Sequence, residues 1–452
     1  MVEASAASLD PGSIMRSRQF VFLLVLAAIL GVVASLVAWG FLELVHETRG
    51  WVYTDLPDAL GFDATPRWWS LPVLAFAGLV VAFAISRLPG SGGHQPSKGL
   101  SSEPIMPVEL PGVFLAGLAT IGLGLVLGPE APLIAMGGGL GLLAVRLVRR
   151  DAPPELGTLV AASGTLAALS FLFGSPLIAA VIVIEAAGLG GPRLPLILVP
   201  GLLAAGIGSL VSIGMGSWTG VDMSDIALQP LSLPDFARPD FVDFLWTIPL
   251  AAAVAVVTFV IFSIARRTEP VVVPRPFLAL PALGIAVSGL AIAFSELTDK
   301  AVDQVLFSGQ DAIGPLVTDA GTWSLSALAL LLAFKGLAYA ISLAGFRGGP
   351  VFPALFLGAA GGLMAAQLPG FSITPAVAVC IGAAVVSVLR LPLAAVVLAT
   401  LLTSGAGLGV GPVIIVGVVV AYLTTLALSR PESPGQPSTE PGPESAAPAV
   451  SG

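Results

Sequence analysis

The chain has 452 residues, of which 56% are hydrophobic and only 10% are charged, and its formal net charge is −8 at pH 7. Soluble globular proteins carry about 25% charged residues, so this composition excludes that class and indicates a membrane protein. We therefore expect a lipid bilayer around the chain and no nucleic acid among its partners.

Apolar runs long enough to span a bilayer recur along most of the chain. The uninterrupted ones cover 20–42, 70–86, 194–215, 245–265, 322–345 and 411–428, and others are broken by Gly or Pro. A helical span needs about 20 residues. The short alternating segments of a membrane β-barrel are not seen, so we predict roughly ten to twelve spans, all helical.

Basic and acidic residues occupy different connecting regions. Arg residues stand before the first span, after 70–86, within 146–150 and after 245–265, whereas the regions 43–63 and 222–243 are acidic. The positive-inside rule then places the N-terminus in the cytoplasm. We expect a multi-pass protein of the cell membrane with both termini cytoplasmic.

The ends of the chain differ in composition from the rest. Residues 431–452 are rich in Pro, Ser, Gly and Glu and cannot bury a core, so we predict that they are disordered, as are residues 1–14. Between them we predict a single transmembrane domain, residues 15–430.

A broken apolar segment in the first half has a counterpart in the second. GPEAPLIAMGGGLG begins at Gly128 and GPVFPALFLGAAGG begins at Gly349, and they match without a gap at both prolines and at three glycines. A second matching pair is aligned on Pro176 and Pro392. The chain is thus read as two homologous halves, about 15–215 and 240–430. Because the second half starts from the opposite face, the predicted fold is an all-α polytopic membrane protein with two inverted-topology repeats, whose broken helices meet at the midplane.

The prolines of the repeated motif indicate helix starts inside the membrane. Proline is tolerated in the first helical turn, so Pro129 and Pro350 mark the starts of two helices. The first turn of a helix presents free backbone N–H groups and a partial positive charge, which favours an anion. A Gly-rich turn with one hydroxyl, Ser91 in GSGG (90–93), is a third candidate for such an anion cradle, with an ordinary turn as the alternative.

Glu130 lies inside this predicted anion site. A carboxylate at mid-membrane depth costs roughly 2.5–3.5 kcal/mol, so it should occupy an electrostatically favourable place, and an anion-binding helix start is one. The side chain would block the site as a tethered anion and swing away when protonated. Glu130 is therefore predicted to be a gate; the alternative is a structural acid that caps its own helix.

With these residues in place, the chain resembles the CLC family of chloride channels and proton/chloride exchangers over nearly all of residues 15–428. GSGGH (90–94) is similar to the family's GSGIP, GPEAP (128–132) to its G(K/R)EGP, and GPVFP (349–353) to its GxFxP, in the same order and spacing. The resemblance implies a prokaryotic-type homodimer without CBS domains, in which each subunit has its own chloride path and Glu130 is the external gate. The anion-binding positions that we expect are Ser91, Gly92, Gly93, Gly128, Pro129, Gly349, Val351 and Phe352.

The sequence departs from the family's pattern in the same motifs. Val351 stands where Phe is usual, and His94 stands in place of Pro. The family's pore tyrosine has no clear equivalent, because the tyrosines of this chain are Tyr53, Tyr339 and Tyr422. The inner wall of the anion site is left undefined.

The departure that bears most on function concerns protons. Exchangers of the family have an internal glutamate ten residues after the proline of the SPL motif; Ala186 stands at that position here, and Glu185 precedes it. A step of one residue turns a helical side chain by about 100°, so Glu185 is either a displaced internal proton site or an ordinary helix-end acid. We therefore predict channel-like or weakly coupled transport of chloride and similar small anions, with a proton/chloride exchanger as the alternative.

Other classes of function have less support. A carrier of organic anions should have several basic residues in its spans, which offer chiefly Lys335 and Arg347. With Cys380 the only cysteine, and His46 and His94 the only histidines, we expect no disulfide framework, no metal and no cofactor. Although His94 lies three residues from Ser91, neighbours in a Gly-rich loop are usually incidental, so we predict no enzyme.

Overall fold

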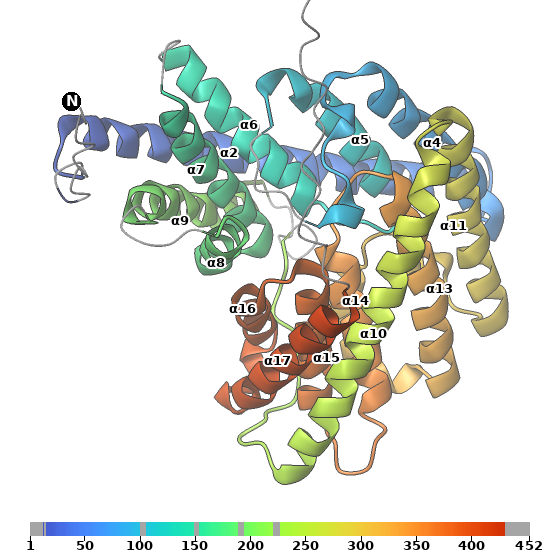
Figure 1. The fold of residues 1–452 in the computed structure, drawn as a ribbon. Helices are drawn as coiled ribbons and strands as arrows, with labels where there is room; N and C mark the ends of the chain where they lie inside the picture. The colour runs from blue at the N-terminus through green and yellow to red at the C-terminus, as the bar shows by residue number, and fades with distance from the viewer. Residues whose placement is uncertain are drawn as a thin grey trace, which may run out of the picture.

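The structure is a computed structural model of the chain, and it describes residue 12 and residues 15–99, 105–148, 153–188, 194–219 and 227–429. The predicted disordered ends, 1–14 and 431–452, lie outside these described residues except for Gly12. All regular elements in the described part are helices (Figure 1).

Among the described residues, the first half of the chain contributes eight α-helices and the second half another eight. The first eight are α2 (Arg18–Gly50), α3 (Leu56–Ala59), α4 (Ser70–Arg87), α5 (Leu110–Gly122), α6 (Glu130–Val148), α7 (Pro154–Phe173), α8 (Pro176–Ala186) and α9 (Leu194–Thr219). The second eight are α10 (Phe241–Val272), α11 (Pro276–Thr298), α12 (Gln310–Thr318), α13 (Leu325–Gly345), α14 (Val351–Ala365), α15 (Ile373–Leu389), α16 (Pro392–Leu402) and α17 (Gly411–Leu428).

Long and short apolar helices both occur in the described part of the chain. Nine helices there are long and apolar enough to cross a bilayer, beside the ten to twelve spans expected. Five other apolar helices of the described residues are only 10–17 residues long, and α8, α14, α15 and α16 are among them. The segments interrupted by Gly and Pro thus form helices shorter than a full span, whose ends must be satisfied by other parts of the protein.

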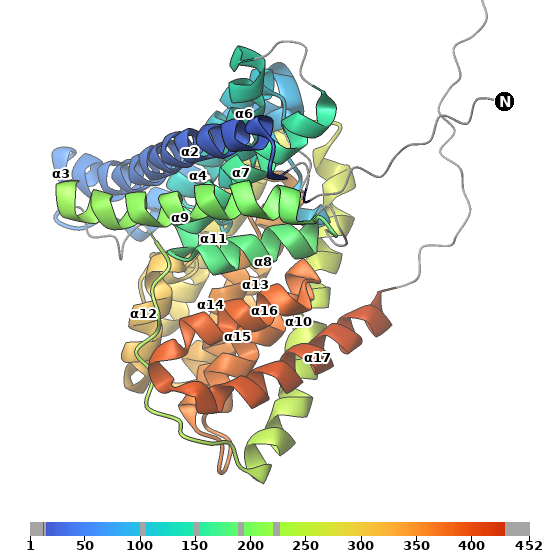
Figure 2. The same ribbon diagram turned by 90° about the vertical axis from the view of Figure 1, so that its left-hand side faces the viewer.

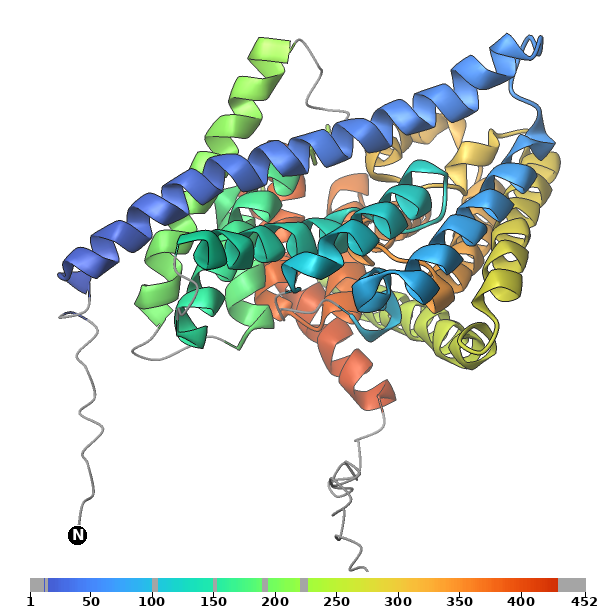
Figure 3. The same cartoon turned by 90° about the horizontal axis from the view of Figure 1, so that it is seen from above.

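The two halves contact each other along the long helices α4 and α11 and along the short helices α8 and α16. Figure 2 shows α2 to α9 above and α14 to α17 below, with α8 beside α16, and these two helices are in contact. Seen from above, α2 runs diagonally across the whole molecule (Figure 3). This arrangement brings the breaks of the two halves to the middle of the protein.

Several of the repeated glycines serve helix packing. A Cβ atom on Gly137 or Gly141 of α6 would overlap the backbone of α7, and a Cβ on Gly358 or Gly362 of α14 would overlap the backbone of α15. Small residues allow such close approach between membrane helices. The matching glycines of the two halves therefore build the same helix pair, α6 with α7 and α14 with α15.

Candidate functional site

The two copies of the repeated motif meet directly. Gly128 N donates to Gly349 O (2.7 Å), and Gly349 N donates to Gly128 O (2.6 Å), which forms an isolated antiparallel bridge. An antiparallel pairing of equivalent residues means that the two loops run in opposite directions, as an inverted repeat requires. The bridge fixes the relative position of the two helices that follow it.

Both of those helices begin where the prolines predicted. Helix α6 begins at Glu130, directly after Pro129, and α14 begins at Val351 with Pro350 as its N-cap residue. The preceding loop of the first half is held by Val126 N, which donates to Ser342 Oγ on α13 (3.1 Å). The N-termini of two helices from different halves are thus brought to one place.

Glu130 occupies that place. Its side chain is buried, with 1% of its surface exposed, and Oε1 accepts a hydrogen bond from Val351 N (2.5 Å). The backbone N–H groups of Phe352 and of Glu130 itself add a favourable electrostatic interaction but no hydrogen bond of normal geometry. The side-chain carboxylate therefore lies at the starts of two helices, in a position that favours negative charge.

The second oxygen of the same carboxylate has a different environment. Oε2 of Glu130 is buried, and it accepts no hydrogen bond from the described residues. A Cβ atom on Gly128 or Gly349 would overlap the carboxyl group, so both positions must lack a side chain for Glu130 to sit there. The glycines of the bridge make room for the carboxylate, in contrast to the packing glycines farther along α6 and α14.

Aromatic side chains close the site on its apolar sides. The ring of Phe352 stacks on that of Phe173, the last residue of α7, with a centroid distance of 5.8 Å. Tyr339 on α13 is 1% exposed, and its hydroxyl donates to Pro350 O (2.6 Å), at the N-cap of α14. Sequence reasoning did not place Tyr339 here; the available signal was a lone phenol in an apolar helix, because a buried tyrosine hydroxyl needs a partner.

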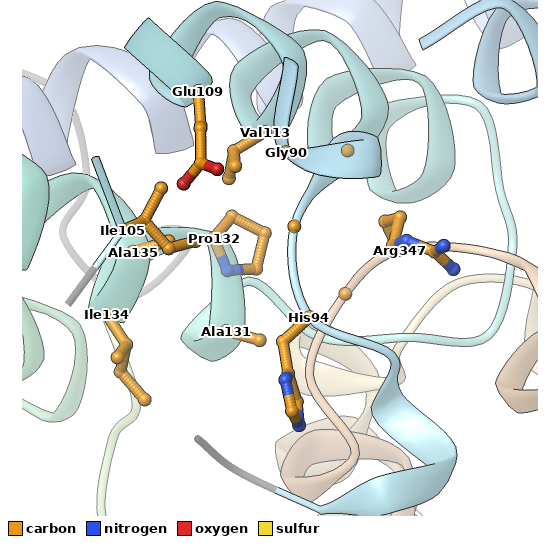
Figure 4. Close-up of a pocket in the computed structure, with 13 residues that line it drawn as sticks. Gly90, His94, Ile105, Glu109, Val113, Ala131, Pro132, Ile134, Ala135 and Arg347 are labelled. Atoms are coloured by element: carbon orange, nitrogen blue, oxygen red, sulfur yellow. The ribbon is translucent and has the colours of Figure 1, made fainter. Parts of the chain in front are cut away.

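The Gly-rich loop approaches the start of α6 from another side. Its residues Gly92 and Gly93 line a cavity of about 250 Å³ together with Pro132 of α6 and Gly348. Figure 4 shows Pro132 facing this loop, with Arg347 beyond it. The predicted loop and the predicted helix starts are therefore neighbours.

Ser91 itself takes part through its backbone. Its side chain is exposed, and its carbonyl oxygen accepts from Nε of Arg347 (3.1 Å). Arg347 is 6% exposed and also donates to Gly345 O and Phe346 O (both 3.2 Å). Because its guanidinium donates to three carbonyl oxygens, Arg347 stabilises the turn at Ser91, where the backbone φ is +50°.

Glu185 makes a second contact between the halves. Its two oxygens accept from Leu393 N (2.9 Å) and Ala394 N (2.7 Å), in the first turn of α16. The N-cap residue of α16, Leu391, has no side-chain oxygen, so Glu185 supplies the cap from the end of α8. This geometry favours the helix-capping interpretation of Glu185.

No metal centre accompanies the site. In the described part of the chain, no group of three or more His, Cys, Asp or Glu side chains could hold a metal ion. Cys380 is buried within α15, and His94 is exposed in the Gly-rich loop.

The sequence model of the family described as "Voltage gated chloride channel" matches residues 78–426 of this chain. That match covers well over half of the chain and includes both copies of the repeated motif. The protein belongs to the voltage gated chloride channel (CLC) family. This membership places the protein among anion transporters of the membrane and not among enzymes.

Curated relatives of this CLC protein are named as transport proteins. The "Putative ion-transport protein YfeO" of Salmonella schwarzengrund (strain CVM19633) is 29% identical over 365 residues, which cover 77% of this chain and 81% of the relative. The protein of the same name from Escherichia coli O7:K1 (strain IAI39 / ExPEC) is 28% identical over 357 residues, covering 77% and 80%.

Solved CLC structures show the same fold. A slow cyanobacterial Cl⁻/H⁺ antiporter superposes with a TM-score of 0.70 at 20% identity, covering 90% of this chain and 94% of the other. A CLC-type fluoride/proton antiporter gives 0.67 at 17% identity, covering 90% and 96%. The predicted family and the predicted all-helical fold are both confirmed.

Proposed function

We propose that this CLC protein moves a small inorganic anion, chloride in the first instance, across the membrane in exchange for protons. Glu130 would block the anion site when charged and carry the proton when neutral. The observation that carries the proposal is a buried carboxylate with only one oxygen hydrogen-bonded. Oε1 accepts from Val351 N, whereas Oε2 has no hydrogen-bond donor among the described residues. Two structural neighbours described as antiporters support exchange over the channel-like transport that the sequence favoured.

The physical argument starts from the cost of that carboxylate. A buried polar group without a hydrogen-bond partner costs about 1–3 kcal/mol, and more when charged. A proton on Oε2 removes the charge and weakens the hold of the helix starts on the side chain. The neutral side chain then leaves, and an anion takes its place on the N–H groups of Val351 and Phe352, with Gly128 and Gly349 leaving the space open.

The anion is proposed by class. The site offers backbone N–H groups, which small halides accept, and the basic residues of the spans are committed elsewhere, as Arg347 is to three carbonyls. A carrier of organic anions would need a larger polar site with available basic residues, so these contacts argue against that substrate class. Because one structural neighbour is described as a fluoride/proton antiporter, fluoride has to be tested beside chloride.

Channel-like transport is the second candidate, and one observation favours it. Ala186 stands where the exchanger pattern has its internal glutamate, and Glu185 has both oxygens occupied as the cap of α16. Under the exchange proposal the proton must therefore reach Glu130 without a side-chain station at 185 or 186. A homodimer and cytoplasmic termini complete the proposal and are supported by the family resemblance and the distribution of Arg.

Reconstitution into liposomes tests both candidates. With a chloride or fluoride gradient and no proton gradient, exchange predicts proton movement against the proton's own gradient, in the direction opposite to the anion. Channel-like transport predicts valinomycin-dependent chloride efflux with no such proton movement. Folded protein that carries neither anion would refute both.

A further inference from the structure

Two neighbouring cavities lie between the C-terminal end of α2 and residues 302–311. The smaller, of about 50 Å³, is lined by Pro129, the residue before Glu130. The larger, of about 590 Å³, is bordered by exposed charged residues such as Arg67 and Asp299. His46, Arg49 and Phe307 line both cavities, so they form the partition between them. An anion that approaches Glu130 from this face must pass the partition.

Phe307 is the fixed part of the partition. It has φ +59°, a strained conformation for a residue other than glycine, and its N–H donates to Gly124 O (3.0 Å). Lys335, fully buried on α13, donates to the carbonyl oxygens of residues 304 to 307 at 2.9–3.3 Å. Tyr53 packs edge-on against the Phe307 ring with a centroid distance of 5.3 Å. These contacts hold the ring in one position.

Arg49 is the charged part of the partition. Its guanidinium lies 4.1 Å from the centroid of the Phe307 ring, and Nη1 is 2.6 Å from Oδ2 of Asp311. The side chains of Arg49 and Asp311 are 33% and 39% exposed, and a pair that exposed is worth only about 0–1 kcal/mol. Another anion can therefore replace Asp311 on the guanidinium at little cost.

The charges around the cavities single out Arg49. It is the only Lys or Arg among the described residues that line the smaller cavity. On the larger cavity, Arg67 is paired with Glu296 (2.8 Å), and Lys300 lies over the ring of Trp323 (4.5 Å). Arg49 is thus the cation that faces the site of Glu130 and the larger cavity alike.

We propose that Arg49 is a second anion-binding residue, placed in series with Glu130 on the route from this face of the protein. The entering anion takes the place of Asp311 on the guanidinium and then passes to the helix starts once Glu130 has left them. Phe307 keeps the guanidinium at the partition while its partner changes. The inference rests on the proposed anion transport.

Arg49→Cys, reconstituted as the full chain and supplied with chloride, tests the proposal. We expect the half-saturating chloride concentration from this face to rise about three- to fivefold, the loss expected for one exposed charged contact. A membrane-impermeant cationic methanethiosulfonate should restore the wild-type value, and an anionic one of similar size should raise it further. The native Cys380 is fully buried in α15, so reagent-treated wild type serves as the background. Arg67→Cys, on the rim of the larger cavity, is the matched control.

Asp311→Asn provides a second and opposite readout. Removing the carboxylate that competes with chloride should lower the half-saturating chloride concentration. If the ion pair were only structural, Asp311→Asn would change this concentration in the same direction as Arg49→Cys does. If both variants keep the wild-type value and the two reagents act alike, Arg49 does not bind the anion. Wild-type protein without anion flux would instead contradict the proposed function itself.

Discussion

Replacing Glu130 by Gln separates the charge of the gate from its shape. The amide keeps the size of the carboxylate, but a hydrogen bond to a charged group contributes about 1.5–3 kcal/mol against about 0.5–1.5 for a neutral one. The bond from Val351 N alone should therefore weaken by about 1 kcal/mol, and the N–H groups of Phe352 and residue 130 add to this. Since about 1.4 kcal/mol corresponds to a factor of ten, we expect chloride to displace the side chain roughly tenfold more readily.

The assay is chloride efflux from liposomes over a range of acidic to neutral pH. In the wild type, lowering the pH protonates Glu130, neutralises it and frees the site, so efflux should become faster as the pH falls. Glu130→Gln should give fast efflux at every pH and no coupled proton movement, because an amide does not carry a proton. Glu296→Gln, an exposed acid paired with Arg67, should behave as the wild type. A Glu130→Gln protein that keeps the wild-type pH profile would show that another group titrates.

Two further predictions follow from the contacts between the halves. Glu185→Gln should lower the free energy of unfolding of the protein in detergent by about 1–2 kcal/mol, because α16 loses a charged cap. The ratio of protons to anions transported should stay unchanged. A variant with normal stability but without coupled proton movement would make Glu185 a proton site. Gly349→Ala should reduce anion flux about tenfold or more, because its methyl group overlaps the Glu130 carboxyl group and the space for the anion, and adding Glu130→Ala should restore part of the flux. Gly40→Ala, at a glycine of α2 with no neighbour within 4 Å, is the control, and equal loss of flux in the single and double variants would contradict the overlap.

The centre of the site could be predicted from the sequence because its signals are local and occur twice. Pro129 and Pro350 mark helix starts by their own conformational restriction, and the repeated motif indicates that the two starts meet. Glu130 could be assigned to this site because a charge inside the membrane is costly and needs a favourable electrostatic environment. None of these steps requires knowledge of which distant residues come into contact.

The surroundings of the site could not be predicted, since they depend on contacts between distant segments. Lys335 binds carbonyls about thirty residues away, and Arg49 pairs with Asp311 across 262 positions. The hydroxyl of Tyr339 donates to the α14 N-cap residue Pro350, eleven positions later, a contact that depends on the path of the chain between α13 and α14. The lengths of the broken helices could not be predicted for a related reason, because the sequence of an interrupted apolar segment does not show whether it crosses the bilayer alone or ends halfway.

Two acidic side chains form hydrogen bonds between the halves, and their geometry suits only one of them to the proposed role of gate. Glu130 and Glu185, both from the first half, accept N–H groups at the starts of α14 and α16 in the second half. Glu185 has both oxygens bonded, so its departure would break two charged hydrogen bonds. Glu130 has one oxygen bonded and one buried without a hydrogen bond, and under the proposed function an incoming anion replaces it on the same N–H groups. We therefore expect the capping interaction to persist at α16 and to exchange with an anion at α14, and the difference lies in the second oxygen.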